Sequence, residues 1–262
     1  MSLLDAVVLG LVQGITEFLP ISSSGHLVLM REWLGISQVG ALTVDAVLQL
    51  ATACAVLLYF RKDITRVVAT FFQWVSRKPL DENEKKLLVA LMLGTIPAVL
   101  AGMLLEDLME TTFRNPMLVA LTLIIGSIVL FIAERVGKGD KGIHGRKGLG
   151  IGLFQVLALV PGFSRSGATI SGGLFLGLSK VEATRFSFLL SIPILLGSGL
   201  KKLTEIGSVP GSGYLVAISA IIAFIVGLIA IDFLLKYVKN HSFNIFIIYR
   251  LILAAVIIFI LL

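Results

Sequence analysis

The residues best suited to chemistry in this sequence precede or lie in a short segment that contains proline, serine and glycine. Gln13 and Glu17 are four residues apart, so they share one face of a helix that ends before Pro20. The segment LPISSSGH at positions 19–26 then adds three serines and His26. A carboxylate and an imidazole can move protons, and a serine hydroxyl becomes a nucleophile once a neighbouring base activates it.

A second segment of the same type supplies groups that bind anions. It reads PGFSRSGATISGG at positions 161–173, where Arg165 carries a planar guanidinium suited to phosphate oxygens. Both segments lead into a new helix, whose free N–H groups and positive dipole end favour an anion. This combination favours a phosphorylated substrate over a neutral one. The hydroxyl donors are Ser22, Ser23, Ser24, Ser164, Ser166 and Thr169.

Most of these side chains also have a structural explanation. Serine and threonine in membrane segments often hydrogen-bond the carbonyl four residues before them, and His26 could be a satisfied core histidine. Asp45 and Arg250 also lie in apolar runs, and we interpret them as structural residues that pair with each other or with backbone. Asp5, Glu134 and Asp232 lie near segment ends, where we expect a membrane interface.

The elements that must position these residues are membrane helices. The 262 residues are 57% hydrophobic and only 15% charged, whereas soluble domains carry about 25% charged residues. We attribute the net charge of +6 to basic cytoplasmic loops rather than to nucleic-acid binding. The single cysteine, Cys54, excludes a disulfide within the chain and a cysteine-based metal site. The N-terminus has no basic region and no A-x-A site, so we expect no removable signal peptide.

Six apolar runs are long enough to cross a bilayer. Two further apolar stretches, 3–35 and 148–178, are interrupted by the proline and serine segments, which break a helix. We predict that each of these stretches is a re-entrant helix-loop-helix hairpin. The fold class expected is therefore an all-α polytopic membrane protein. The six spans are predicted at about 44–60, 87–105, 116–134, 183–200, 214–235 and 243–262.

The two broken stretches also resemble each other. An offset of 142 positions, as from Gly10 to Gly152, aligns six identical residues in the window 10–25. Chance gives roughly one or two identities at this composition. Three spans follow each hairpin, and an odd number of crossings inverts the second half, so the pattern predicts an inverted-topology repeat. The repeats would cover about 1–135 and 148–262 of a single transmembrane domain, 1–262.

The same offset aligns Ser23 with Arg165. If a two-fold axis in the membrane plane relates the halves, equivalent loop positions face each other across it. These two side chains are then expected to reach one phosphate near the midplane. Glu17 and His26 are expected to line the same cavity.

Basic residues set the expected orientation. Segments 61–86 and 135–147 are rich in lysine and arginine and are separated by two spans, so both are expected on the cytoplasmic side, together with 236–241. The loop 106–115 is acidic and is expected outside. The first hairpin then enters from outside, and the site opens to the outer face. Residues 66–74 mix basic and aromatic side chains in a partly amphipathic pattern, which favours an interfacial helix.

At these residues the chain resembles the integral membrane undecaprenyl-diphosphate phosphatase family, the type linked to bacitracin resistance. The first family motif appears here as QGITEFLPISSSGH at 13–26 and the second as PGFSRSGATI at 161–170. The sequence IYR at 248–250 also fits, and the similarity runs over essentially the whole chain. Gln13 stands where many members have glutamate, and a glutamine cannot act as a base or as a charged metal ligand.

The resemblance implies hydrolysis of undecaprenyl diphosphate to undecaprenyl phosphate and inorganic phosphate, near the outer leaflet of the bacterial inner membrane. It also implies a divalent cation, Mg²⁺ or Ca²⁺, with Glu17 as its expected ligand. Ser23 is the expected nucleophile with Glu17 or His26 as base, while attack by His26 or by water is left open. The implied catalytic residues are Glu17, Ser23, His26 and Arg165, and the expected phosphate ligands are Gln13, Ser22, Ser24, Ser164, Ser166 and Thr169.

The main alternative is a transporter or flippase for a lipid or a small anion, because secondary transporters share inverted repeats and broken helices. Release of phosphate from a lipid diphosphate distinguishes the two, since a transporter would release none. The partners expected are a polyprenyl diphosphate substrate and membrane lipids, with a homodimer left open and no nucleic acid.

Overall fold

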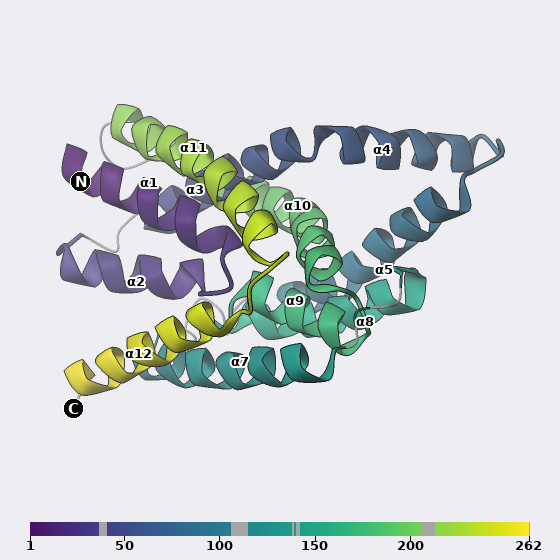
Figure 1. Cartoon of the computed structure of the whole chain (residues 1–262). Coiled ribbons are helices and arrows are strands. Elements are labelled where there is room, and N and C mark those ends of the chain that lie inside the picture. Colours follow the sequence, from purple (N-terminus) through teal and green to yellow (C-terminus); the bar gives the residue numbers. More distant parts are fainter. Residues whose placement is uncertain (37–40, 106–114, 138, 140–141, 206–212, 262) are drawn as a thin grey trace.

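The computed structural model describes residues 1–36, 41–105, 115–137, 139, 142–205 and 213–261. All secondary-structure elements within these ranges are helices, which confirms the all-α prediction (Figure 1). The elements are α1 (Leu3–Phe18), α2 (Ser23–Trp33), α3 (Ala41–Tyr59), α4 (Arg61–Val75), α5 (Glu82–Leu104), α7 (Pro116–Val136), α8 (Gly145–Val156), the short 3-10 helix η2 (Leu157–Leu159), α9 (Arg165–Phe175), α10 (Lys180–Glu205), α11 (Gly213–Tyr237) and α12 (Asn244–Leu261).

Five of the described helices are long and apolar enough to cross a membrane: α5, α7, α10, α11 and α12. A sixth span is obtained if α3 and α4 are counted together, although the chain bends by 83° between them. These helices overlap the six runs predicted from the sequence. They support a multi-pass membrane protein. The predicted outer loop 106–115 lies almost wholly outside the described residues.

Both stretches predicted to be broken form two helices joined by a loop. Helix α1 ends at Phe18 before Pro20, and η2 ends at Leu159 before Pro161. The second helix of each pair starts after a serine with positive φ, 76° at Ser22 and 73° at Ser164. Each of these serines caps its helix by accepting the N–H of the glycine three residues later. Such backbone costs about 1–3 kcal/mol per residue, and it recurs here at two positions that are 142 apart.

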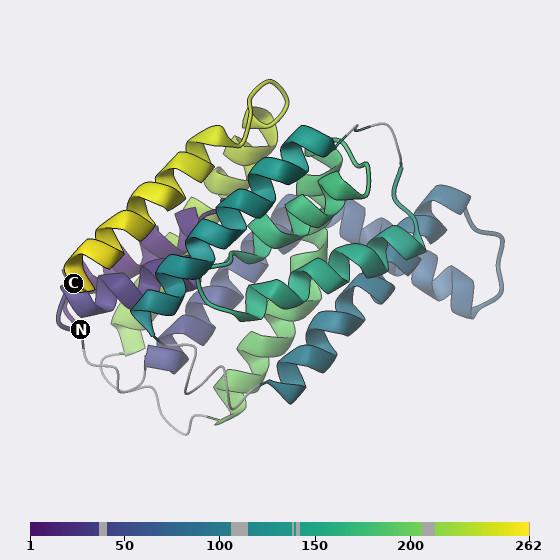
Figure 2. The same ribbon diagram turned by 90° about the horizontal axis from the view of Figure 1, so that it is seen from below.

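Small residues let the two first half-helices pack closely on long helices. Helix α1 lies on α11, where a Cβ added to Gly14 would come within 2.9 Å of the Ala223 carbonyl oxygen. Helix α8 lies on α5, where a Cβ on Gly152 would overlap the backbone of Gly94. Helix α3 also packs on α10, and α7 runs beside α12 (Figure 2).

Several helix ends meet on one side of the bundle through polar contacts of α10. Lys180 Nζ pairs with Glu134 Oε1 at 2.8 Å and donates to the His241 carbonyl at 3.0 Å. One turn further along α10, Arg185 pairs with Asp63 at the start of α4. The contacts bring the end of α7, the α11–α12 turn and the start of α4 together. Parts of the three predicted basic loops therefore share one side of the protein.

Candidate active site

The two loops that interrupt the broken helices are bonded directly to each other. The Gly162 N–H donates to Ser22 Oγ at 3.1 Å, and Ser166 Oγ donates to the Leu19 carbonyl at 3.0 Å. Each bond joins residues about 140 positions apart. The loops, and the helix starts that follow them, therefore form one structural unit.

Arg250 of α12 holds the two loops together through hydrogen bonds to their backbone. Its side chain is fully buried, and its guanidinium donates to the carbonyls of Pro20 at 3.2 Å, Gly162 at 3.3 Å and Phe163 at 3.0 Å. A fourth, longer contact reaches the Thr122 carbonyl at 3.5 Å. The structural interpretation of Arg250 as a residue bonded to backbone is thus confirmed.

Asp45 does not pair with Arg250, so that alternative is wrong. Asp45 forms an ion pair with Arg31 of α2, whose side chain is 3% exposed. The two residues are 14 positions apart on different helices, and the sequence contains no periodicity that links them. The ion pair joins α2 to α3.

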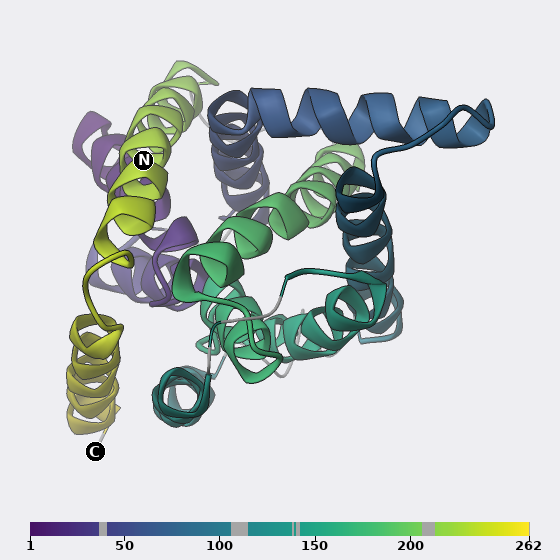
Figure 3. The same ribbon diagram turned by 45° about the vertical axis from the view of Figure 1, so that its right-hand side comes forward.

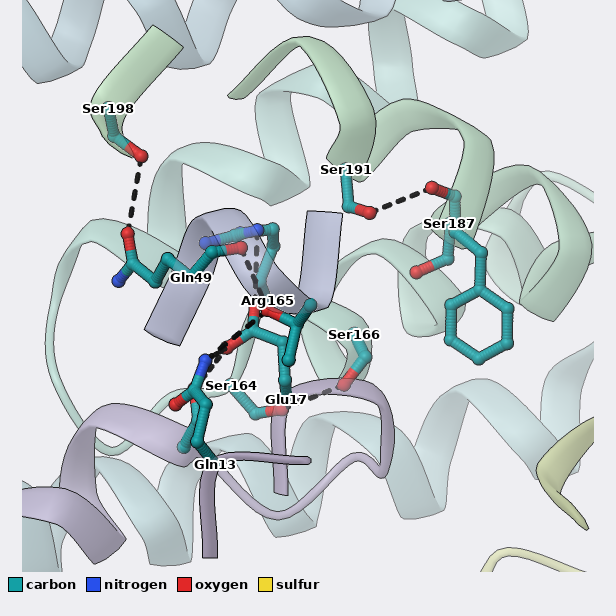
Figure 4. Close-up of polar contacts among 12 residues, drawn as sticks. Gln13, Glu17, Gln49, Ser164, Arg165, Ser166, Ser187, Ser191 and Ser198 are labelled. Atoms are coloured by element: carbon teal, nitrogen blue, oxygen red, sulfur yellow. Dashed lines mark hydrogen bonds and ion pairs between the residues drawn. The ribbon is translucent and has the colours of Figure 1, made fainter. Parts of the chain in front are cut away.

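Glu17 lies at the centre of the predicted site. Its carboxylate is buried, and Oε2 accepts hydrogen bonds from Ser23 Oγ at 2.6 Å and from Gln13 Nε2 at 3.0 Å. The other oxygen, Oε1, pairs with Arg165 Nη1 at 3.2 Å. Figure 4 shows Gln13 and Arg165 converging on this carboxylate from different helices. The structure therefore brings four of the predicted residues together, and the expected proximity of Ser23 and Arg165 is confirmed.

Arg165 has N–H groups that are not used by Glu17. Within the described part of the chain, Glu17 is the one partner of its guanidinium, and 20% of the side chain is exposed. The remaining N–H groups form a fork that can bind phosphate oxygens in two places. Because Arg165 and Ser23 are the first residues of α9 and α2, both side chains also stand at helix N-termini. Those ends favour an anion.

His26 lies in the same loop region but contacts other groups. Its Nδ1 is 2.7 Å from the Ser22 carbonyl, and its Nε2 is 2.7 Å from the Tyr249 hydroxyl. A carbonyl only accepts, so Nδ1 carries the proton and Nε2 accepts from Tyr249. The two rings are stacked with centroids 5.6 Å apart. Both ring nitrogens are occupied, and neither contacts Glu17 or Ser23.

The remaining predicted phosphate ligands mainly brace the loops. Ser22 and Ser164 are the helix caps described above, and each contacts the serine two positions later, Ser24 at 3.4 Å and Ser166 at 3.2 Å. Thr169 bonds the Arg165 carbonyl at 2.8 Å and Ser187 Oγ at 2.5 Å. Phosphate binding by these hydroxyls stays a prediction.

The sequence analysis did not identify the residues that α10 contributes to the site. Ser187 and Ser191 are four residues apart on α10 and face a small cavity beside Glu17 and Arg165 (Figure 4). Polar residues at this spacing in an apolar span were the signal that could have identified them. The lining consists of Glu17, Phe18, Arg165, Ser166, Ser187, Phe188 and Ser191. The prediction that His26 lines the same cavity as Glu17 is therefore wrong, because the His26 ring is held by Ser22 and Tyr249 instead.

The oxygen atoms at the site fit a hard cation only in part. Gln13 Oε1 is buried without a hydrogen-bond partner and lies on the helix face that carries Glu17. Carbonyl and carboxylate oxygens are the ligands that Mg²⁺ and Ca²⁺ prefer. In the described ranges, however, there is no group of three or more His, Cys, Asp or Glu side chains that could enclose a metal ion. A cation here would need oxygens from a substrate as well.

Comparisons with known proteins identify the relatives of this chain. Residues 6–256 match the family described as bacitracin resistance protein BacA. Curated proteins named undecaprenyl-diphosphatase align with almost the whole chain. The protein of Elusimicrobium minutum is 46% identical over 98% of this chain and 98% of its own length. That of Corynebacterium striatum is 45% identical over 96% and 92%, and that of Thermobifida fusca 40% over 98% and 89%.

Proposed function

Because this chain belongs to the BacA family of bacitracin resistance proteins, we propose that it hydrolyses undecaprenyl diphosphate to undecaprenyl phosphate and inorganic phosphate. The enzyme is thus a membrane hydrolase that returns the lipid carrier to cell-wall synthesis. The observation that carries the proposal is the Glu17 carboxylate, which binds a nucleophilic hydroxyl on one oxygen and an arginine on the other. The transporter alternative finds no support among the relatives.

The nucleophile we propose is Ser23. Its hydroxyl already donates to Glu17 Oε2 at 2.6 Å, so the carboxylate is placed to take the proton as Oγ attacks the terminal phosphorus. The bond from that phosphorus to the bridging oxygen breaks, undecaprenyl phosphate leaves with that oxygen, and Glu17 passes its proton to the departing phosphate. Water then attacks the phosphoserine while Glu17, again ionised, takes a proton from the water; the bond from phosphorus to Ser23 Oγ breaks, inorganic phosphate leaves, and Glu17 returns the proton to Oγ. His26 has no contact with this pair and is better suited to holding the α2 loop against Tyr249.

Arg165 and the two helix N-termini would hold the diphosphate. In the free site the guanidinium neutralises Glu17. When the substrate enters, the N–H groups of Arg165 that do not contact Glu17 can bind its terminal phosphoryl oxygens. The negative charge of these oxygens strengthens such hydrogen bonds. The hydroxyls of Ser187 and Ser191 line the same cavity and would contact the group that is transferred. Positioning and charge stabilisation then account for most of the rate, as is usual in phosphoryl transfer.

A divalent cation, Mg²⁺ or Ca²⁺, belongs to the proposal. Glu17 and the unpaired Gln13 Oε1 would hold it, with diphosphate oxygens completing its shell. When bound, it would neutralise charge on the diphosphate.

We also propose the membrane arrangement. The helix pairs α1–α2 and α8–α9 would be re-entrant hairpins, and α3, α5, α7, α10, α11 and α12 the six spans. What supports an inverted repeat is the correspondence of contacts: α1 lies on α11 as α8 lies on α5, and α3 on α10 and α7 on α12 join equivalent helices. Because the basic loops are expected on the cytoplasmic side, the site would face the outer side of the bacterial inner membrane.

Phosphate release by the purified protein tests the proposed function. The protein in lipid nanodiscs, supplied with undecaprenyl diphosphate and Mg²⁺, should release one phosphate per substrate and leave the monophosphate lipid. Glu17→Gln should release almost none. A protein that binds the lipid without phosphate release would overturn the proposal in favour of the transporter.

A further inference from the structure

Helix α4 has no role in the site, yet it is the most exposed of the helices whose burial the structure describes throughout. It leaves α3 at an angle of 83° and projects beyond the other helices together with the start of α5, which it contacts (Figures 1 and 3). In Figure 3 it lies across the view, whereas α7 and α12 are seen nearly end on. A helix at right angles to its neighbouring span lies along the membrane surface if that span crosses the bilayer.

The residues of α4 divide into two faces. At 100° per residue, the apolar side chains fall on one half of the helix surface, and the opposite half carries Lys62, Arg66 and Gln73. Thr70 is the one buried residue of α4. The apolar face includes side chains that are exposed in the structure, namely Val68 47%, Phe71 39%, Phe72 62%, Trp74 42% and Val75 65%.

Charge determines which partner fits this helix. Positions 61–78 contain five basic residues and one acidic residue, Asp63, and that carboxylate is already paired with Arg185 of α10. Exposed aromatic and aliphatic side chains next to a basic stripe match the boundary between acyl chains and negatively charged headgroups. Lys180 contacts the end of α7 and the turn between α11 and α12, which brings the other basic loops to the same side.

We propose that α4 is an in-plane anchor that binds anionic phospholipids in the cytoplasmic leaflet. The apolar face enters the leaflet to the level of the first acyl carbons, and Arg61, Lys62, Arg66, Arg77 and Lys78 bind phosphate groups of the lipids. The Asp63–Arg185 ion pair fixes the start of the helix to α10. The inference concerns lipid rather than substrate and does not depend on the hydrolytic activity.

Tryptophan fluorescence tests the depth of α4. The chain has two tryptophans, Trp33 and Trp74, so Trp33→Phe leaves Trp74 as the one reporter. In vesicles of phosphatidylcholine, lipids brominated near the headgroup should quench Trp74 more than lipids brominated near the chain ends. Strongest quenching from the bilayer centre would overturn the proposal. So would protection from both brominated lipid and aqueous acrylamide, because it would show that a protein covers the helix.

Lipid selectivity is tested in the same variant. Brominated phosphatidylglycerol should quench Trp74 more than brominated phosphatidylcholine at equal mole fraction, since each basic residue enriches anionic lipid about fivefold at low salt. Lys62→Gln/Arg66→Gln should remove most of the difference. Arg146→Gln/Lys239→Gln is the matched control, which removes two exposed charges elsewhere and should keep it. Equal quenching by both lipids in the parent variant would overturn the anionic-lipid part. An unchanged Tm in detergent shows that each variant is folded, and Trp33→Tyr replaces Trp33→Phe if the latter is not.

Discussion

Ser23 and Arg165 lie on opposite oxygens of one carboxylate. Ser23 Oγ is 2.6 Å from Glu17 Oε2, and Arg165 Nη1 is 3.2 Å from Glu17 Oε1. The two residues begin α2 and α9, and they are 142 positions apart, the same offset that aligns the two loops. The first half of the chain thus supplies the proposed nucleophile and base, and the second half supplies the guanidinium of Arg165. Neither half holds the proposed site alone.

Replacement of Arg165 should nearly abolish turnover. Arg165→Ala removes the guanidinium fork, and Arg165→Lys replaces it with a point charge that cannot bind two phosphate oxygens in one plane. Phosphate release should fall by at least roughly 100-fold in both variants, and a cooperative thermal transition in detergent should show that both variants remain folded. A near-normal rate in the lysine variant would contradict the role assigned to Arg165.

Glu17 and Gln13 should differ although they share a helix face. Glu17→Gln removes the proposed base and should lower kcat by more than about 100-fold. Gln13→Ala should be milder, because Gln13 cannot act as a base: it donates to Glu17 and Thr52 and offers an unpaired oxygen. Steady-state rates of both variants, measured on one batch of substrate, provide the comparison. Equal losses would mean that the two roles are divided wrongly.

The helix breaks and the pairing of the two loops can be predicted from the sequence, and the other long-range contacts cannot. Pro20, Pro161 and the serines that follow them mark the helix breaks, because proline and capping serines act within a few residues. The repeat then places Ser23 opposite Arg165. The ion pair of Arg31 with Asp45 and the contact of His26 with Tyr249 depend on how helices pack. No sequence spacing encodes those contacts.

The helix α4 illustrates the same limit in another way. The amphipathic pattern of 66–74 indicates an interfacial helix, and the structure places it in a helix that starts at Arg61. The 83° bend before it has no proline or glycine at Tyr59, Phe60 or Arg61. The tertiary contact of Asp63 with Arg185 helps to set the direction of the helix, and a single sequence does not reveal that contact.

Removal of divalent ions should silence the enzyme. Glu17 and Gln13 offer too few ligands for a closed metal site, so any cation should bind together with the diphosphate and exchange freely. EDTA should reduce phosphate release to background, and excess Mg²⁺ should restore it. Full activity in chelator, with metal removal verified by elemental analysis, would exclude the cation from the account.

Arg250 should matter for stability more than exposed arginines do. Arg250→Met leaves the carbonyls of Pro20, Gly162 and Phe163 without their buried donor, at a cost of about 1–3 kcal/mol for each unpaired group. The apparent Tm in detergent should fall by roughly 5–10 °C or more. Arg185→Met, which breaks an exposed ion pair, is the control and should shift Tm by roughly 2 °C or less. Equal shifts would show that the loops do not depend on the Arg250 clamp.

The rate of phosphate release by Ser23→Ala, set against that of Ser24→Ala, tests the central claim most directly. The two variants lose the same hydroxyl group at adjacent positions, but Ser23 Oγ contacts Glu17 whereas Ser24 Oγ contacts Ser22. With undecaprenyl diphosphate and Mg²⁺ in nanodiscs, Ser23→Ala should lose more than about 100-fold and Ser24→Ala less than about tenfold. A Ser23→Ala enzyme that works at the parent rate, or an equal loss in both variants, would contradict a site built on Glu17, Ser23 and Arg165.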